Sequence, residues 1–254
     1  MHFLVSLRLS NLSLMLPKVK YQSLNNITYQ SGWDLQTELH NVLKSNKLEW
    51  RNLSEEEKSK KKQLHHLLFC QHNHVYTLGK SGSQDHLLLD DAGLDSSDIE
   101  YFKINRGGDI TYHGPGQITG YPILDLDEFF TDVHKYVRLL EECVIQLLDT
   151  YGIAGSREEG FTGVWIQHKE KNSPKRKICA IGVHLSRWVT MHGFALNVNT
   201  DLSYFKNIVP CGIADDDKTV TSMEAELGKK VDQEEVKMRL KSIFAQVFEF
   251  EYIQ

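Results

Sequence analysis

The chain reads Arg106-Gly107-Gly108-Asp109-Ile110-Thr111-Tyr112-His113-Gly114-Pro115-Gly116-Gln117 near its middle. Glycine adopts positive φ and allows close approach of other groups, so the two glycine clusters in this stretch predict tight turns with exposed amides. The residues between the clusters favour a strand. We therefore expect a hairpin here. It either lines a ligand pocket, presenting Arg106, His113 and Gln117, or closes the edge of a sheet.

The segments on either side of this stretch alternate between strand-like and helical patterns. Apolar periodicity predicts helices over residues 33–43 and 236–247, and a long amphipathic helix that begins at the cap Thr131 and ends at Gly152. Strand-like runs cover residues 66–70, 75–78, 118–126, 163–167, 177–185 and 190–198. Because no repeat or low-complexity linker divides these elements, we expect one α/β domain over residues 17–254. Its mixed, largely antiparallel sheet is flanked by helices.

Residues 1–16 are candidates for a disordered N-terminal extension. They are apolar but interrupted by Ser and Asn, and they are too short and too polar to cross a membrane. They also lack the charged head and cleavage site of a secretory signal. We expect a cytoplasmic protein, or a mitochondrial one if this extension is a targeting peptide; translation from Met15 is a further alternative.

The bulk composition limits the classes of partner. The chain has 254 residues, 41% hydrophobic and 25% charged, which is ordinary for a soluble globular protein. Its formal net charge of -5 argues against nonspecific binding to nucleic acid. We therefore expect neither a nucleic-acid partner nor a membrane partner.

The cysteines and histidines do not predict a metal site. Four cysteines lie far apart without a C-x-x-C spacing, so neither a zinc ribbon nor a redox pair is indicated, and free thiols in a reducing compartment are expected. His65, His66, His72 and His74 lie close in sequence but lack Cys or carboxylate partners at ligand spacing. We expect no metal and no cofactor.

Four motifs together resemble one family, the lipoyl(octanoyl) transferases. The run from Arg106 to Gln117 resembles the family signature, and three further motifs follow in the same order at similar spacing. These are Lys177-Ile178-Cys179-Ala180-Ile181-Gly182, His192-Gly193-Phe194-Ala195-Leu196-Asn197-Val198-Asn199 and Ile208-Val209-Pro210-Cys211-Gly212. The resemblance extends from about Tyr76 to Gly212 and implies the fold shared by biotin and lipoate protein ligases.

The resemblance implies an activity and its partners. Such an enzyme takes an octanoyl group from octanoyl-acyl carrier protein and holds it as a cysteine thioester. It then passes the group to a lysine of a lipoyl domain, the first step of protein lipoylation in lipoate biosynthesis. The implied acceptors are the lipoyl domains of 2-oxoacid dehydrogenases and the glycine cleavage H protein.

The residues themselves leave two cysteines as candidate nucleophiles. Cys211 lies in a turn between Pro210 and Gly212, whereas Cys179 shares a strand face with Lys177. Cys70 and Cys143 lie in apolar surroundings, which raise the pKa of a thiol. The resemblance places the nucleophile at Cys211 and the activating lysine at Lys177. A lysine near the thiol favours the thiolate, and desolvation lowers the lysine pKa from ~10.4 so that it can exchange a proton near neutrality.

The resemblance also implies which residues line the pocket for the acyl chain and the carrier arm. They are Arg106, Gly107, Gly108, Asp109, Ile110, Thr111, Tyr112, His113, Ala180, Ile181, Gly182, Gly193, Phe194 and Ala195. Gly193 to Ala195 offer small residues beside an aromatic wall. Backbone amides near Gly212 or in the segment 180–182 are candidate oxyanion donors. His113 is either a hydrogen-bond partner near the thiolate or a structural residue.

Two other functions and one surface remain open. The same fold supports ATP-dependent lipoate or biotin ligases, which form an acyl-adenylate without a nucleophilic cysteine, and a noncatalytic module could bind lipoyl domains. The basic segment 169–177 either steers an acidic carrier domain or forms a solvated hairpin tip. Two departures from the family pattern make the docking of the donor harder to infer. Gln71-His72-Asn73-His74 replaces the expected Glu-His-Pro-Pro, and the loop 169–175 is long.

Overall fold

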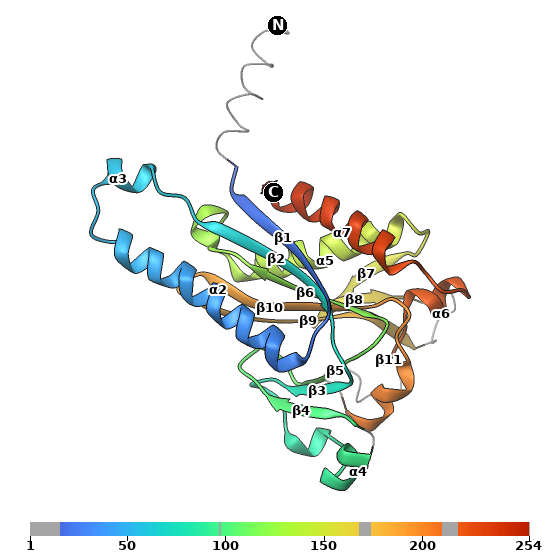
Figure 1. The fold of residues 1–254 in the computed structure, drawn as a ribbon. Helices are drawn as coiled ribbons and strands as arrows, with labels where there is room; N and C mark the ends of the chain where they lie inside the picture. The colour runs from blue at the N-terminus through green and yellow to red at the C-terminus, as the bar shows by residue number, and fades with distance from the viewer. Residues whose placement is uncertain (1–15, 97, 168–173, 210–217, 254) are drawn as a thin grey trace, which may run out of the picture.

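The computed structural model describes residues 16–96, 98–167, 174–209 and 218–253, which form two sheets with flanking helices (Figure 1). The strands of the described residues are β1 (Lys18–Asn26), β2 (Leu64–Gln71), β3 (Val75–Leu78), β4 (Glu100–Lys103), β5 (Ile110–His113), β6 (Gln117–Ile123), β7 (Gly155–Glu158), β8 (Phe161–Ile166), β9 (Lys175–Ser186), β10 (Val189–Asn197), β11 (Lys218–Val220) and β12 (Glu251–Ile253). The α-helices are α2 (Tyr29–Trp50), α3 (Glu55–Ser59), α4 (Asp91–Ser96), α5 (Val133–Asp149), α6 (Met223–Leu227) and α7 (Gln233–Phe248). Short 3-10 helices cover Gln84–His86, Leu126–Glu128 and Leu202–Asn207.

The large sheet is mixed, as the sequence predicts. Its described strands run in the order β12-β1-β2-β6-β10-β9-β8-β7, with β11 beside β9, and the pairs from β2 through β6, β10, β9 and β8 to β7 are antiparallel. Helix α2 covers one face, while α5 and α7 cover the other (Figure 1). The predicted α/β class with a helix-flanked, largely antiparallel sheet is confirmed.

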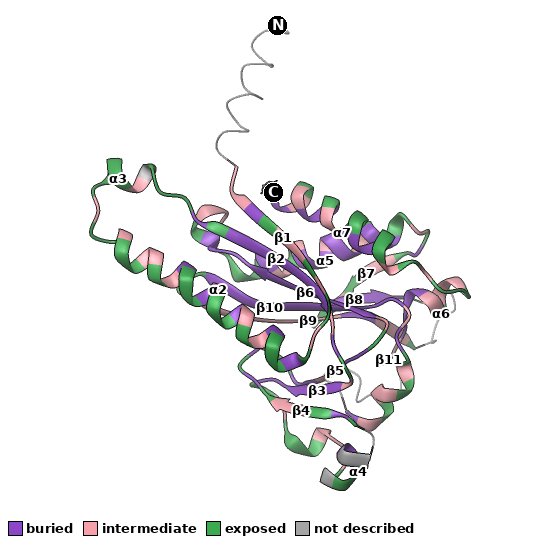
Figure 2. Cartoon of the chain, viewed as in Figure 1, coloured by how far each residue is buried: buried purple, intermediate pink, exposed green. Residues whose placement is uncertain are grey.

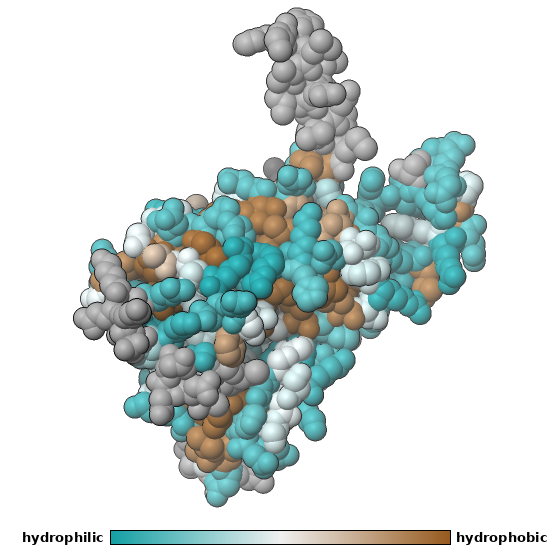
Figure 3. Space-filling model, turned by 180° about the vertical axis from the view of Figure 1, so that it is seen from behind, coloured by the Kyte–Doolittle hydropathy of each residue, from teal (hydrophilic) through white to brown (hydrophobic). Residues whose placement is uncertain are grey.

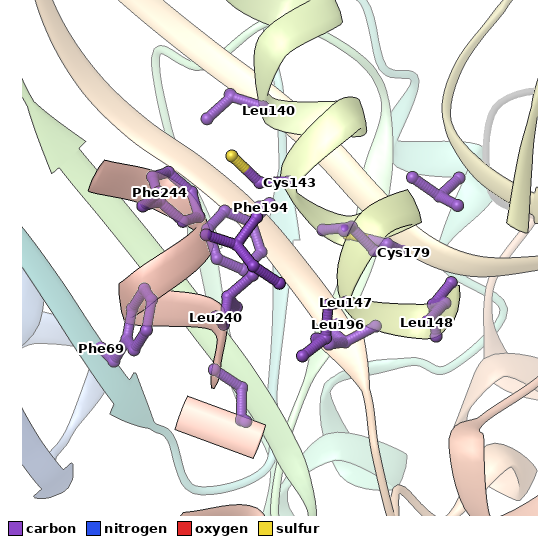
Figure 4. Packing of buried hydrophobic residues seen from close by; sticks show 14 of the residues in the cluster. Phe69, Leu140, Cys143, Leu147, Leu148, Cys179, Phe194, Leu196, Leu240 and Phe244 are labelled. Atoms are coloured by element: carbon purple, nitrogen blue, oxygen red, sulfur yellow. The ribbon is translucent and has the colours of Figure 1, made fainter. Parts of the chain in front are cut away.

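The main core lies between the large sheet and the helices α5 and α7. Phe69, Phe194 and Phe244 meet there, and the Phe194 and Phe244 rings stack with centroids 5.6 Å apart (Figure 4). Cys143 and Cys179 fill space in the same cluster. Figure 2 shows the consequence for the strands in the middle of the sheet, which are buried along their length, whereas the outer side of α2 is exposed.

Two helices differ in detail from their prediction. Helix α2 spans Tyr29–Trp50, whereas the apolar periodicity predicts residues 33–43. It begins earlier because the Thr28 side chain caps it by accepting from Ser31 N, and its last turns extend beyond the apolar stripe. Helix α5 is capped by Asp132, whose side chain accepts from Lys135 N, and not by Thr131. An aspartate one residue later provides the same kind of acceptor, so the sequence located the helix start to within one position.

The predicted hairpin at residues 106–117 is wrong. Strand β5 pairs antiparallel with β3 and belongs to a small sheet of the described residues with the order β4-β3-β5, whereas β6 runs between β2 and β10 in the large sheet. The segment Gly114-Pro115-Gly116 therefore carries the chain from one sheet to the other. Gly116 has φ +84°, and a Cβ there would lie 2.3 Å from Asn199 O, so this crossover requires glycine.

The first and last described strands close one edge of the large sheet. Strand β1 pairs in parallel with β12, with Lys18 opposite Glu251, and the two side chains form an ion pair. None of the helices among the described residues has the length and apolar character needed to span a bilayer. Seen from behind, the surface carries hydrophobic areas in its centre and in its lower part, each bordered by hydrophilic residues (Figure 3). The expected extension at residues 1–16 lies outside the described residues except for Leu16.

Candidate functional site

A cavity of about 330 Å³ lies where the loop before β5 meets β9 and β10. Its wall contains Lys177 and every residue predicted to bind substrate except Tyr112. These are Arg106, Gly107, Gly108, Asp109, Ile110, Thr111, His113, Ala180, Ile181, Gly182, Gly193, Phe194 and Ala195. Segments far apart in the sequence are thus brought to one site. The described residues contain no group of three or more His, Cys, Asp or Glu side chains arranged to hold a metal ion.

Glycines allow the Arg106 loop to lie directly on β9. Gly107 N donates to Val183 O over 2.9 Å. A Cβ on the neighbouring Gly182 would come within 2.8 Å of Gly107 O and 3.0 Å of Arg106 Cδ. On the other side of the loop, a Cβ on Gly79 would lie 2.2 Å from Gly108 O. The loop is therefore clamped between two glycine positions.

The Arg106 guanidinium holds this loop in place from inside. Its Nη2 donates to Thr77 O over 2.5 Å and to Thr77 Oγ1 over 3.0 Å, and its Nη1 donates to Gly107 O over 3.0 Å. Arg106 is 7% exposed, and burial lowers the pKa of its guanidinium. Three hydrogen bonds to two neighbouring residues make this arginine a fixed part of the cavity wall.

Asp109 and Tyr112 have different surroundings although they are close in sequence. Asp109 Oδ1 accepts from its neighbour Ile110 N over 2.7 Å, and its Oδ2 pairs with His86 Nδ1 at 2.5 Å. Tyr112 does not line the cavity. Its ring stacks on Tyr204 with centroids 5.0 Å apart, and it packs in the smaller core beneath β3 and β5.

His113 is buried and neutral. Burial, the neighbouring His72 and the Arg106 cation lower the pKa of His113 to about 3. Its Nδ1 lies 2.9 Å from Gln117 Oε1, and its Nε2 lies 3.4 Å from Thr77 Oγ1. Of the two interpretations of this residue, the described contacts favour the structural one, because both ring nitrogens already have partners inside the protein.

Lys177 lies on β9 beside β8 and β11. It is paired with Trp165 and with Val220, and its Nζ lies 4.5 Å from the centre of the Trp165 ring. Cys211, the predicted nucleophile, lies outside the described residues, as do Lys169 and Lys171. Strand β11, however, follows the segment 210–217 in the chain and runs parallel to β9 with Val220 opposite Lys177. Within the basic segment, Lys175 pairs with Glu158, and Arg176 pairs with Glu226.

The three described cysteines are poor candidates for a nucleophile. Cys70, Cys143 and Cys179 are 0% exposed. Desolvation raises the pKa of each thiol above its ordinary value. Cys179 shares β9 with Lys177, but it belongs to the core on the α5 side of the sheet. Unlike Lys177, it does not line the cavity.

The sequence did not identify several residues of the cavity wall. Tyr29, Tyr121, Phe161 and Val220 come from four other elements. The rings of Tyr29, Tyr121 and Phe161 build the aromatic wall, since the Phe194 ring packs in the core with Phe69 and Phe244. His192 also lines the cavity, with φ +60°. Its place directly before Gly193 was part of a motif, but the left-handed backbone of a histidine has no sequence signal.

Comparisons with known proteins agree on one family. Residues 44–245 match the model of the lipoyl protein ligase A/B catalytic domain. An octanoyltransferase of Cytophaga hutchinsonii is 54% identical over 91% of this chain and 93% of its own length. An octanoyltransferase of Flavobacterium johnsoniae is 52% identical over 93% of this chain and 99% of its own length. A bi-partite lipoate protein ligase of Thermoplasma acidophilum has the same fold, with a TM-score of 0.64 at 16% identity over 94% of this chain and 86% of that one.

Proposed function

This chain belongs to the lipoyl protein ligase A/B catalytic-domain family, and we propose that it is an octanoyltransferase that works through a thioester on Cys211 activated by Lys177. Octanoyl transfer is supported by relatives of that name at more than half identity over nine tenths of the chain. The assignment of the two catalytic residues rests on the motifs and on the cavity.

One observation carries the catalytic assignment. Lys177 is on the wall of the cavity that also collects the predicted substrate-binding residues. Of the four cysteines in the sequence, three are buried thiols with raised pKa. Cys211 is the cysteine that remains, and β11 returns the chain from its segment to the side of Lys177.

The reaction then proceeds in two acyl transfers. The Cys211 thiol gives its proton to Lys177, and the thiolate sulfur attacks the thioester carbon of the donor. The bond from carbon to the carrier sulfur breaks, and Lys177 returns the proton to the departing thiol. In the second transfer, Lys177 takes one proton from the acceptor ammonium, and the amine nitrogen attacks the Cys211 thioester carbon. The bond from that carbon to the Cys211 sulfur breaks, the nitrogen loses its second proton to water, and the cysteine leaves as thiolate. Backbone amides near Gly212 or in the segment 180–182 are the candidate donors to each oxyanion.

The donor and the acceptors belong to the proposal. We expect octanoyl-acyl carrier protein to deliver the acyl group, and lipoyl domains of 2-oxoacid dehydrogenases and the glycine cleavage H protein to receive it. We also expect the reaction to take place in the cytoplasm without a cofactor.

Trapping the intermediate tests this function. After incubation with octanoyl-acyl carrier protein and no nucleotide, intact mass should rise by one octanoyl group. The adduct should map to Cys211 and be removed by hydroxylamine. Cys211→Ser should abolish the labile adduct, whereas Cys179→Ala, which changes a buried thiol, should keep it. Dependence of transfer on ATP would instead support a ligase, and absence of both adduct and turnover would support a binding module.

A further inference from the structure

A continuous chain of hydrogen bonds connects the Arg106 loop to Lys177 through the floor of the cavity. Its middle members are the side-chain amides of Gln117 at the start of β6 and Asn197 at the end of β10, which are 1% and 4% exposed. Gln117 Nε2 donates to Asn197 Oδ1 over 3.0 Å, and Asn197 Nδ2 donates to Thr221 O over 3.0 Å. Thr221 N in turn donates to Lys177 O over 2.9 Å.

Backbone carbonyls fix the direction of every bond in this chain. A carbonyl oxygen only accepts, so the atom of Asn197 next to Thr221 O must be its amide nitrogen, and its oxygen must face Gln117. Gln117 Nε2 also donates to Tyr112 O over 3.2 Å, which orients the second amide in the same way. Neither amide can be reversed without bringing two acceptors together.

The tautomer of His113 is fixed in the same way. Gln117 Oε1 has only lone pairs, so His113 Nδ1, 2.9 Å away, carries the proton of the neutral ring. His113 Nε2 then accepts from the Thr77 hydroxyl, whose oxygen also accepts from Arg106 Nη2 over 3.0 Å. The donors therefore run in one direction from His113 through Gln117 and Asn197 to Thr221, and end on the peptide carbonyl of Lys177.

We propose that Gln117 and Asn197 are positioning residues for Lys177. They hold Thr221, which directly follows β11, and Thr221 holds the backbone of Lys177 at a set distance from the loop that carries Arg106. Loss of the Asn197 amide would free the end of β11 and let the lysine backbone shift relative to the cavity. The proposal rests on the proposed function for its catalytic meaning, but the positioning itself is independent of turnover.

Asn197→Asp tests the proposal with little change in shape. The variant replaces the donor to Thr221 O by an oxygen, so two acceptors face each other in a buried place. Asn199→Asp is the matched control. Asn199 lies two residues further on and clamps another backbone segment, with Nδ2 donating to Val231 O over 2.8 Å and Oδ1 accepting from Val231 N over 3.0 Å, but no bond in the chain above uses it. Gln117→Glu provides a second variant if Asn197→Asp does not fold.

The first readout is the position of Lys177, measured without turnover. Lysines carrying ¹³C-methyl groups are observed by NMR, and the Lys177 signal is assigned by its loss in Lys177→Arg. Because Nζ lies 4.5 Å from the Trp165 ring centre, ring currents should shift this signal away from those of solvent-exposed lysines. Asn197→Asp should move it, and Asn199→Asp should leave it in place.

The second readout is catalysis. Asn197→Asp should lower kcat by about 10- to 100-fold, since misplacing a reacting group by about 1 Å has an effect of that size, while KM for the acyl donor stays the same. Its profile of kcat against pH should also change shape. Equal kcat values, equal pH profiles and equal Lys177 signals in Asn197→Asp and Asn199→Asp would overturn the proposal. A wild-type protein that does not transfer octanoyl, but whose Lys177 signal moves in Asn197→Asp, would refute the function and leave the positioning intact.

Discussion

Gly182 is a residue whose missing side chain shapes the cavity. In Gly182→Ala the new methyl group would meet Gly107 O at 2.8 Å and Arg106 Cδ at 3.0 Å, so the loop must move away from β9. We expect a destabilisation of about 1–3 kcal/mol, typical of forced overpacking, measured by urea unfolding. Gly107→Ala is the control, because its methyl group would meet only Val183 O, at 3.4 Å. Equal losses of stability in the two variants would show that the close contact at Gly182 does not matter.

For individual residues, the sequence motifs predicted which positions belong to the site better than they predicted backbone conformation. The predicted positions from Arg106 to Ala195 line one cavity, apart from Tyr112. They do so because the motifs lie on the loop before β5 and on β5, β9 and β10, which together build the wall. The left-handed backbone of His192 was not predictable, since few non-glycine residues adopt positive φ and the local sequence does not mark which of them do. A tertiary contact at this residue is made by Gln36 Oε1, which accepts from His192 N over 3.0 Å.

At the scale of elements, periodicity identified most helices and strands but not which strands pair. Strands β5 and β6 are separated by three residues and still belong to different sheets. A two-strand hairpin is the expected solution for such a short connection, and only the pairing of β5 with β3 excludes it. Pairing depends on contacts between segments far apart in the chain, which local sequence patterns do not contain.

Strand β11 depends on a clamp that can be tested separately. Arg176 Nε and Nη2 donate to the two oxygens of Glu226 over 2.8 and 3.0 Å, and the Thr221 hydroxyl donates to the same carboxylate over 2.6 Å. Arg176→Lys keeps the charge but removes the two-point contact. We expect faster amide hydrogen exchange in residues 218–221, with residues 178–180 in the middle of β9 unchanged. Unchanged exchange in β11 would mean that strand pairing alone holds it.

For the molecule as a whole, buried histidines make stability depend on pH. Burial lowers the pKa of His113 and His192 to about 3 and that of His72 to about 4, all below the ordinary value of 6.5. Between about pH 6.5 and 4 the unfolded chain binds protons that the folded chain does not. The contribution of these rings to the free energy of unfolding is therefore complete above pH 6.5 and decreases on acidification. The slope of this free energy against pH approaches about 1.4 kcal/mol per pH unit for each ring.

Urea unfolding at several pH values from 5 to 7 measures this slope. His113→Gln should reduce the slope of the unfolding free energy against pH by about the contribution of one buried ring, because the variant no longer has that titrating group. His134→Gln, which changes an exposed side chain at the start of α5, should keep the wild-type slope. A slope that is the same in all three proteins would exclude His113 as a source of the acid sensitivity.

The pairing of β1 with β12 has a consequence for how the protein is made. Synthesis proceeds from the N-terminus, so β1 leaves the ribosome more than two hundred residues before its partner Glu251–Ile253. Until then the outer edge of β1 offers unpaired amides and carbonyls to any other extended chain. Nascent molecules are thus most exposed to wrongful association at this edge of the sheet, until β12 has been synthesised and pairs with β1.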